Sequence, residues 1–228
     1  MIRRLLVTLL ILLPVAAAAE PVITVTGQGE VTAAPDIATV SVGVEVSAPR
    51  ADEALALNAA RMAEIFAAIA AAGIDRKDVQ TSQISLNPQW DSQTKSYDEP
   101  LRITGFLATN IVSVRLRDIG RLGTVLDSLT ATGANRIQGI GFGLADPRPQ
   151  IDQARELAVQ DALRKASLYA AAAGLRLGPI LSIDEGGGTA PPPAYRMEAM
   201  LEATPVAEGE VSYSAAVTMR FRLESGAP

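Results

Sequence analysis

The chain has 228 residues, a mass of 23.8 kDa and a formal net charge of −5, and it contains neither cysteine nor histidine. Thiol nucleophiles, serine–histidine–aspartate triads, histidine-ligated zinc or haem and structural zinc clusters are therefore excluded. The acidic balance also disfavours binding to nucleic-acid phosphates and to anionic lipid surfaces. Any catalysis would have to use Asp, Glu, Lys, Ser, Thr or Tyr side chains.

The first 19 residues have the pattern of a secretory signal peptide. Arg3 and Arg4 precede an apolar run, Leu5–Leu13, that is shorter than the roughly 20 residues a membrane-spanning helix needs. Small residues before position 20 predict cleavage after Ala19. Cleavage removes two of the 20 basic side chains, so 18 remain against 25 acidic ones and the net charge becomes −7. We therefore expect a soluble exported protein with no membrane span after cleavage.

Two extended stretches open the exported chain, Val22–Val31 and Ile37–Val46, and the second alternates valines with small or polar residues like a half-buried strand. The period then changes to that of a helix over Ala51–Ala72, which Gly73 ends. Its inward side is expected to contain Leu55, Ala59, Met62, Phe66 and Ile69. The next segments are a strand at Val79–Asn87, a polar stretch at Pro88–Pro100 and an apolar-alternating strand at Arg102–Leu116.

A second helix is predicted over Asp118–Thr132, capped by Asp118 and ended by Gly133. Its expected inward residues are Ile119, Leu122, Val125, Leu126 and Leu129. A strand at Ile137–Leu144 precedes a third helix, Gln150–Ala173, in which Asp161 and Lys165 lie one turn apart. The remaining segments are a strand at Leu175–Ile183, a Gly- and Pro-rich segment at Glu185–Gly209 and a strand at Val211–Leu223.

This order predicts an α+β fold with two related subdomains, in which helices pack on one face of largely antiparallel sheets. We expect a ββαβ subdomain at 20–100 and a βαβαββ subdomain at 101–228, with a Pro/Gly-rich insertion at 185–209 in the second. A row of small residues on the third helix would let it lie close to its sheet; the row is Ala154, Ala158, Ala162 and Ala166.

Two glycine patterns need an explanation. Gly27-Gln28-Gly29 follows a predicted strand, but no helix opens after it, so the pattern favours a turn or bulge over a dinucleotide-binding loop. Alternating glycines at 139, 141 and 143 leave a smooth sheet face that a helix or a second chain can approach. Phosphate binding there is disfavoured, because the next helix begins several residues later.

Adjacent acids outside the helices, Asp98-Glu99 and Asp184-Glu185, point apart on extended backbone and form no obvious acid/base pair. The oxygen-rich segment Asp91–Glu99 lacks the acidic spacing and the glycine of a calcium loop. Ser92 and Lys95 match a Ser-x-x-Lys spacing, but no helix start or second motif accompanies them. We therefore predict no catalytic, cofactor-binding or metal-binding residue.

Aromatic residues in predicted loops are the candidate contact points for a partner. Trp90, Tyr97 and Tyr195 either cap the edges of the core or anchor another protein. Met197 and Met200 lie in the segment YRMEAML, where a thioether could be oxidised reversibly, although packing is the preferred role for methionines here. The candidate partner-contact residues are Trp90, Tyr97, Tyr195, Met197 and Met200.

Four segments carry a resemblance to a known family: ITVTGQGEVTAAPDIATVSVGVEV at 23–46, GIDRKDVQTSQISLNPQW at 73–90, the helix-to-strand run at 154–187, and TPVAEGEVSYSAAVTMRFRL at 204–223. In this order they resemble the SIMPL-domain family of bacterial envelope proteins. That family includes a periplasmic immunogenic protein and proteins associated with oxidative-stress defence. The resemblance implies an α+β fold, a periplasmic location and a non-enzymatic role in envelope or oxidative-stress defence, with no cofactor.

Three functions from different classes remain open. The first is action through protein contacts, either as a homo-oligomer or with an envelope protein partner, using the glycine-alternating strand or the segment at 185–209. The second is a small-ligand binding module in a cleft between the two subdomains. The third is a carboxylate-based hydrolase, which requires two buried acids in one pocket, and the sequence offers no such pair.

Overall fold

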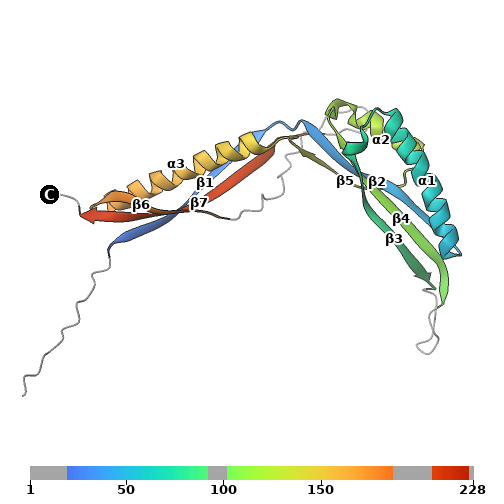
Figure 1. Cartoon of the computed structure of the whole chain (residues 1–228), viewed down its shortest axis with the longest axis horizontal. Coiled ribbons are helices and arrows are strands. Elements are labelled where there is room, and N and C mark those ends of the chain that lie inside the picture. The colour runs from blue at the N-terminus through green and yellow to red at the C-terminus, as the bar shows by residue number, and fades with distance from the viewer. Residues whose placement is uncertain (1–19, 92–101, 187–206, 226–228) are drawn as a thin grey trace, which may run out of the picture. The chain divides into compact units, whose positions relative to one another are not determined.

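A computed structural model of the chain describes residues 20–91, 102–186 and 207–225. The described residues form two compact units, each built from an antiparallel sheet and the helices that pack on it (Figure 1). The three-stranded unit takes its described residues from Met1–Gly29, Arg155–Gly188 and Ala216–Pro228, and the four-stranded unit takes them from Glu30–Ala154 and Thr189–Ala215. The predicted α+β fold is confirmed.

The four-stranded unit has the element order β-α-β-β-α-β. Its elements are β2 (Ile37–Ala48), α1 (Ala51–Ala71), β3 (Val79–Trp90), β4 (Ile103–Leu116), α2 (Leu122–Ala131) and β5 (Arg136–Gly143), with short 3₁₀ turns η1 (Arg76–Asp78) and η2 (Ile119–Arg121). The sheet order is β3-β4-β2-β5, and every neighbouring pair is antiparallel. This order and connectivity are those of a ferredoxin-like unit.

Both helices of this unit pack on the same face of the sheet. The alternating valines of β2 place Val40, Val42 and Val44 in the core, as their period predicts. From β4, the same core receives Val112 and Val114. The expected inward face of the second helix is also present, with Leu122, Val125, Leu126 and Leu129 buried in that core.

The buried stripe of α1 differs from the predicted one. The structure buries Ala54, Asn58, Met62, Ile65 and Ile69, whereas the predicted inward residues Leu55 and Phe66 are 43% and 40% exposed and Ala59 is exposed. The helix itself carries apolar and small residues on every side, so the periodicity of its sequence does not identify the buried face. By length and composition α1 could also cross a membrane. In the structure, its buried stripe packs on the sheet.

Asn58 is the polar residue in that buried stripe. Its side-chain amide donates to the carbonyl oxygens of Val44 on β2 and Ala108 on β4, at 2.9 and 3.1 Å. A buried amide without such partners would cost free energy, so these bonds favour one position of α1 along the sheet. The residue therefore links the helix to two central strands.

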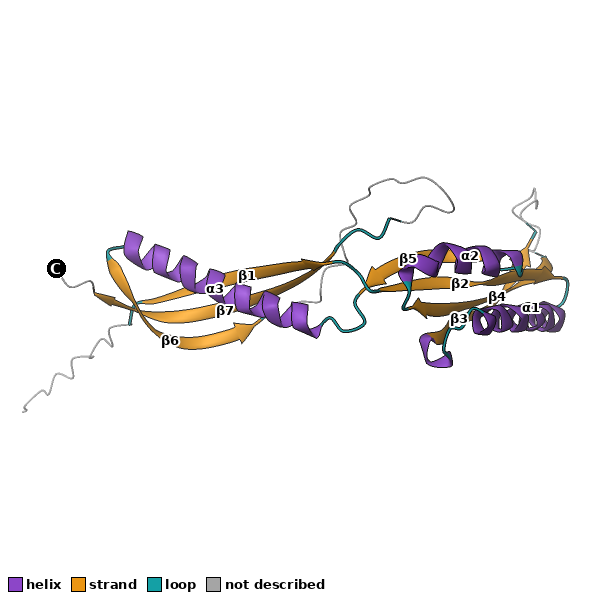
Figure 2. Ribbon diagram, turned by 90° about the horizontal axis from the view of Figure 1, so that it is seen from above, coloured by secondary structure: helices purple, strands orange, loops and turns teal. Residues whose placement is uncertain are grey.

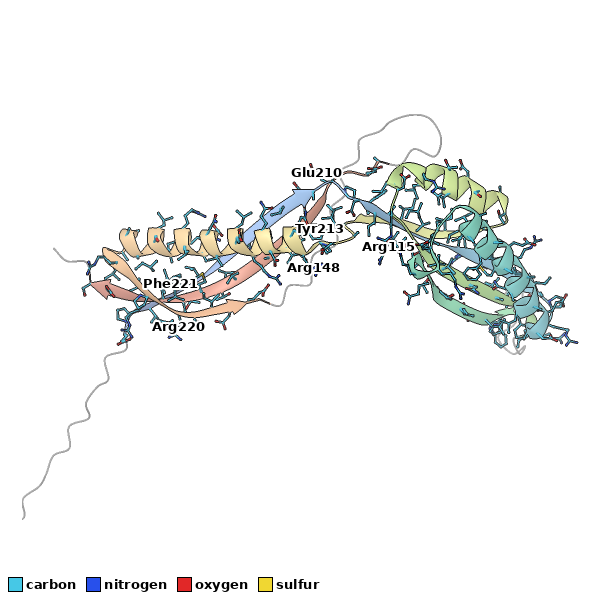
Figure 3. The ribbon with its side chains drawn as sticks, turned by 45° about the horizontal axis from the view of Figure 1, so that its top comes forward. Arg115, Arg148, Glu210, Tyr213, Arg220 and Phe221 are labelled. Carbon is cyan, nitrogen blue, oxygen red and sulfur yellow. The ribbon has the colours of Figure 1, made fainter. Side chains whose placement is uncertain are left out.

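The three-stranded unit is built from β1 (Val22–Ala33), α3 (Arg148–Ala172), β6 (Leu175–Glu185) and β7 (Val211–Ser225), in the sheet order β1-β7-β6. The helix lies along one face of this sheet (Figure 2). Neighbouring residues of β7 alternate between the two faces, so Phe221 is buried in the core while Arg220 is exposed (Figure 3). Strands from the two ends of the chain therefore share one small core.

The alanine row lets α3 approach the sheet as closely as the sequence predicts. The fully buried positions recur every fourth residue: Ala154, Ala158, Ala162, Ala166 and Ala170. Because an α-helix turns about 100° per residue, this row rotates about 40° at each step, so the contact face follows the twist of the sheet.

At Gly27 the helix α3 lies very close to β1. A Cβ added at Gly27 would lie 2.0 Å from the carbonyl oxygen of Ala158 and 2.5 Å from the backbone nitrogen of Ala162. The predicted turn or bulge at Gly27-Gln28-Gly29 is wrong: these residues are part of a strand whose burial alternates residue by residue under a helix.

The two units divide the chain differently from the predicted boundary at residue 100. Strands β3 and β4 lie on either side of that residue and pair along nearly their whole length, which keeps them in one sheet. Strand β1, predicted in the first subdomain, shares a sheet with β6 and β7. Most of the predicted Pro/Gly-rich insertion, residues 187–206, lies outside the described residues.

Candidate interaction surfaces

Of the five predicted contact residues, the structure describes only Trp90. It is the last residue of β3 and pairs with Ile103, the first residue of β4. Both side chains are 49% exposed, so an aromatic and an aliphatic group lie together at the end of the hairpin. Exposed tryptophans beside apolar residues are typical anchors of protein interfaces. Tyr97, Tyr195, Met197 and Met200 lie outside the described residues.

The glycine-alternating segment forms β5, an edge strand of the four-stranded sheet. Cβ atoms added at Gly139 and Gly141 would meet nothing within 4 Å, so this part of the strand is open. The register with β2 shifts next to Ser41, where Gly139 adopts a positive φ of 153°. Such an irregularity weakens the free edge as a template for further strands.

Strand β6 has a free edge that is more apolar than that of β5, and none of its residues is among the predicted contact residues. Ile180, Leu181 and Ile183 are 48%, 43% and 55% exposed, and we call these three residues the β6 apolar edge. The strand lies at the border of its sheet, beside β7 only. The signal in the sequence is the apolar segment Pro179–Ile183, interrupted only by Ser182, but a short apolar run of this kind is equally typical of a buried strand.

Charged residues flank the β6 apolar edge. Glu185, at the end of the strand, accepts a 2.8 Å hydrogen bond from Nε of Arg155 on α3. The side chains of Arg176 and Asp184, near the two ends of β6, have no hydrogen-bond or ion-pair partner among the described residues. The strand thus carries an unpaired positive charge at its start and an unpaired negative charge at its end.

Asp161 links α3 to β1 on the other side of the unit. Its carboxylate accepts hydrogen bonds from Lys165 Nζ at 2.6 Å, from the backbone N–H of Gln28 at 3.0 Å and from Arg164 at 2.6 Å. These bonds, that of Lys165 first, lower the pKa of Asp161 well below its usual range. Lys165 also donates to the carbonyl of Thr26. The predicted Asp161–Lys165 pair is therefore part of a structural link between α3 and β1.

The described residues contain no pair of buried acids. Asp78 is the buried carboxylate among them, with 5% of its side chain exposed. It accepts two hydrogen bonds from Arg117, at 2.9 and 2.8 Å, and these lower its pKa. Within the described ranges, no three acidic side chains gather closely enough to hold a metal ion. The acids predicted at Asp98-Glu99 lie outside those ranges.

Comparisons with known proteins place this fold in a family. Residues 23–221 match SIMPL, described as a protein of unknown function (DUF541). The 26 kDa periplasmic immunogenic protein of Brucella melitensis is 33% identical over 212 residues, which make up 89% of this chain and 84% of that protein. The uncharacterized protein YggE of Escherichia coli K12 is 30% identical over 198 residues, or 86% of this chain and 78% of that protein. The chain belongs to the SIMPL family.

Proposed function

We propose that this protein is a non-catalytic periplasmic protein that acts through protein contacts, and that two copies associate through β6. The observation that carries the proposal is the β6 apolar edge, which exposes three large aliphatic side chains on a strand with a free edge. Free apolar edges of this kind are usually covered in functional proteins. The name of the Brucella relative supports the periplasmic location. A role in envelope or oxidative-stress defence is part of the proposal.

The charge pattern of β6 favours a second copy of the same chain as the partner. When two β6 strands approach antiparallel about a two-fold axis near Ile180, Arg176 of each copy lies opposite Asp184 of the other. Both charges are unpaired among the described residues of one copy, and the apolar edge lies between them. A contact with two-fold symmetry therefore pairs the charged side chains at both ends of the strand.

Side chains, not a long hydrogen-bond ladder, make this contact. Pro179 lacks a backbone N–H, and the register between β6 and β7 shifts on both sides of Ile180. These features prevent open-ended strand addition, as bulges and prolines do on natural edge strands. Because the contact is small, we expect a monomer–dimer equilibrium with a dissociation constant of about micromolar order.

Light scattering of the purified protein across a range of concentrations tests the proposal. Arg176→Glu and Asp184→Lys each set like charges opposite one another in both halves of the dimer, so each variant should remain monomeric. The double variant restores opposite charges and should recover the dimer. Leu168→Lys, on an exposed part of α3, is the control and should leave the wild-type equilibrium unchanged.

Circular dichroism must show that every variant is folded. A wild-type protein that stays monomeric at all concentrations would refute the proposed dimer. Equal association by the two single variants and the double variant would refute the β6 contact, even if the wild-type protein proved oligomeric.

Three alternatives have less support. A carboxylate-based hydrolase lacks the required pair of buried acids among the described residues. Reversible oxidation of Met62 or Met219 is disfavoured because both are buried packing residues, and Met197 and Met200 lie outside the described residues. Ligand binding in a cleft between the subdomains stays a prediction, which a thermal-shift screen can test.

A further inference from the structure

A cavity of about 490 Å³ lies between α1 and the edge strand β3. Phe66, Ile69 and Ala70 line it from the helix, and Val79 and Thr81 line it from the strand. The core residues of α1 pack with β2 and β4, and β3 lies beyond β4 at the border of the sheet. The helix therefore covers this part of β3 incompletely: Val79 is half-buried against the core, whereas Thr81 is exposed. Phe66, which is 40% exposed, borders the resulting space.

One cationic group, Arg76 of η1, lines the cavity. The charged side chains next to Arg76 already form ion pairs: Lys77 pairs with Asp75 at 2.9 Å, and Asp78 pairs with Arg117. The side chain of Arg76 has no hydrogen-bond or ion-pair partner among the described residues. Its guanidinium is therefore free to bind an anionic group at the same place where apolar walls could hold a hydrocarbon chain.

The size and lining of this space suit a small molecule. Ligand pockets commonly measure about 300–1,000 Å³ and combine apolar walls with a few polar groups that fix orientation. Here the walls are aliphatic and aromatic, and the polar groups are one guanidinium and the hydroxyl of Thr81. A chain with a carboxylate at one end matches this arrangement by charge and by hydrophobicity.

We propose that this cavity binds small apolar carboxylates, such as medium-chain fatty acids. The acyl chain lies between α1 and β3, and the carboxylate pairs with Arg76. The site lies entirely within the four-stranded unit, so it is independent of the proposed β6 contact.

Isothermal titration calorimetry with hexanoate, octanoate and decanoate tests the proposal. Burial of each added methylene should tighten binding about fourfold. 1-Octanol, which keeps the chain but lacks the charge, should bind about tenfold more weakly than octanoate. Arg76→Gln should remove this difference, whereas Lys77→Gln makes the same change of charge one residue away and should preserve it.

A second variant tests the position of the acyl chain. Ala70→Trp fills the space beside Phe66 and should abolish octanoate binding without loss of folding, because Ala70 is exposed on α1. Three results would overturn the proposal: no octanoate binding at millimolar concentration, equal affinity for octanoate in wild type and Arg76→Gln, or binding by the Ala70→Trp variant. A peptide with a free C-terminus that binds where octanoate does not would overturn the choice of ligand.

Discussion

Replacement of Gly27 by alanine is the sharpest test of how α3 packs on the three-stranded sheet. The added Cβ would lie 2.0 Å from the carbonyl oxygen of Ala158, whereas ordinary contacts begin at 3.4 Å. The helix and strand must therefore separate by up to about 1.4 Å at this point. Since the obstructing atoms belong to the helix backbone, no side-chain rotation can relieve the contact.

The expected cost follows from overpacking and lost contact. Extra methyl groups in a tightly packed core typically cost about 1–3 kcal/mol. Separation of α3 from the sheet also weakens the neighbouring alanine contacts, so we expect the upper end of this range, about 3 kcal/mol. For a chain of this size that corresponds to a fall in melting temperature of about 6–12 °C.

Thermal unfolding followed by circular dichroism measures this effect, with two matched controls. Gly141→Ala adds the same methyl group to a strand where no atom lies within 4 Å, so its melting temperature should stay close to that of the wild type. Ala162→Gly in the Gly27→Ala background removes only a side-chain contact and should not restore stability. Gly27→Ala with wild-type stability, or full rescue by Ala162→Gly, would show that the helix does not approach the strand through its backbone.

Three further predictions concern buried and charged groups. Asn58→Leu removes the donor to two strand carbonyls and should destabilise the protein by about 1–3 kcal/mol in urea unfolding, whereas an unchanged midpoint would contradict its bridging role. Arg117→Met removes the two hydrogen bonds to the buried Asp78 carboxylate and should lower the urea midpoint at neutral pH. That deficit should shrink in acid, where the carboxyl can be protonated, and a pH-independent deficit would count against this explanation. The pKa of Asp161 is lowered on folding by Lys165 above all, so the unfolded chain binds the proton first and stability falls as the pH drops below the ordinary value of 3.8. Between about pH 5 and pH 3, the urea midpoint of Asp161→Asn should fall less steeply with decreasing pH than that of the wild type. Equal slopes would refute the stabilising role of the Asp161 carboxylate.

Much of the local structure can be predicted from the sequence. The alternating valines of β2 and the apolar spacing of α2 identify both elements and their buried faces, because side-chain period directly reflects strand and helix geometry. The alanine row of α3 likewise predicts its close packing, because only small side chains permit a short distance between helix and sheet. Gly73 and Gly174 mark the ends of two helices and both adopt the positive φ that favours glycine.

The buried face of α1 and the role of Gly27 depend on partners far away in the chain. Leu55 and Phe66 are as apolar as the residues that are buried, so their exposure depends on where Asn58 and the sheet place the helix. Gly27 is needed because Ala158, more than a hundred residues away, approaches it. Neither fact has a signature in the nearby sequence.

For the candidate interaction site, the sequence is enough to identify Trp90, the exclusion of cysteine and histidine chemistry, and the strand that contains Ile180. The position of β6 at the border of its sheet follows from the tertiary structure, in which β7 pairs with β6 on one side and β1 on the other, and these two strands come from opposite ends of the chain. The cavity between α1 and β3 also exists only because β3 is an edge strand beyond the helix. Periodicity reports which side chains share a face, but exposure depends on which strands find neighbours, and that is set by contacts between distant parts of the chain.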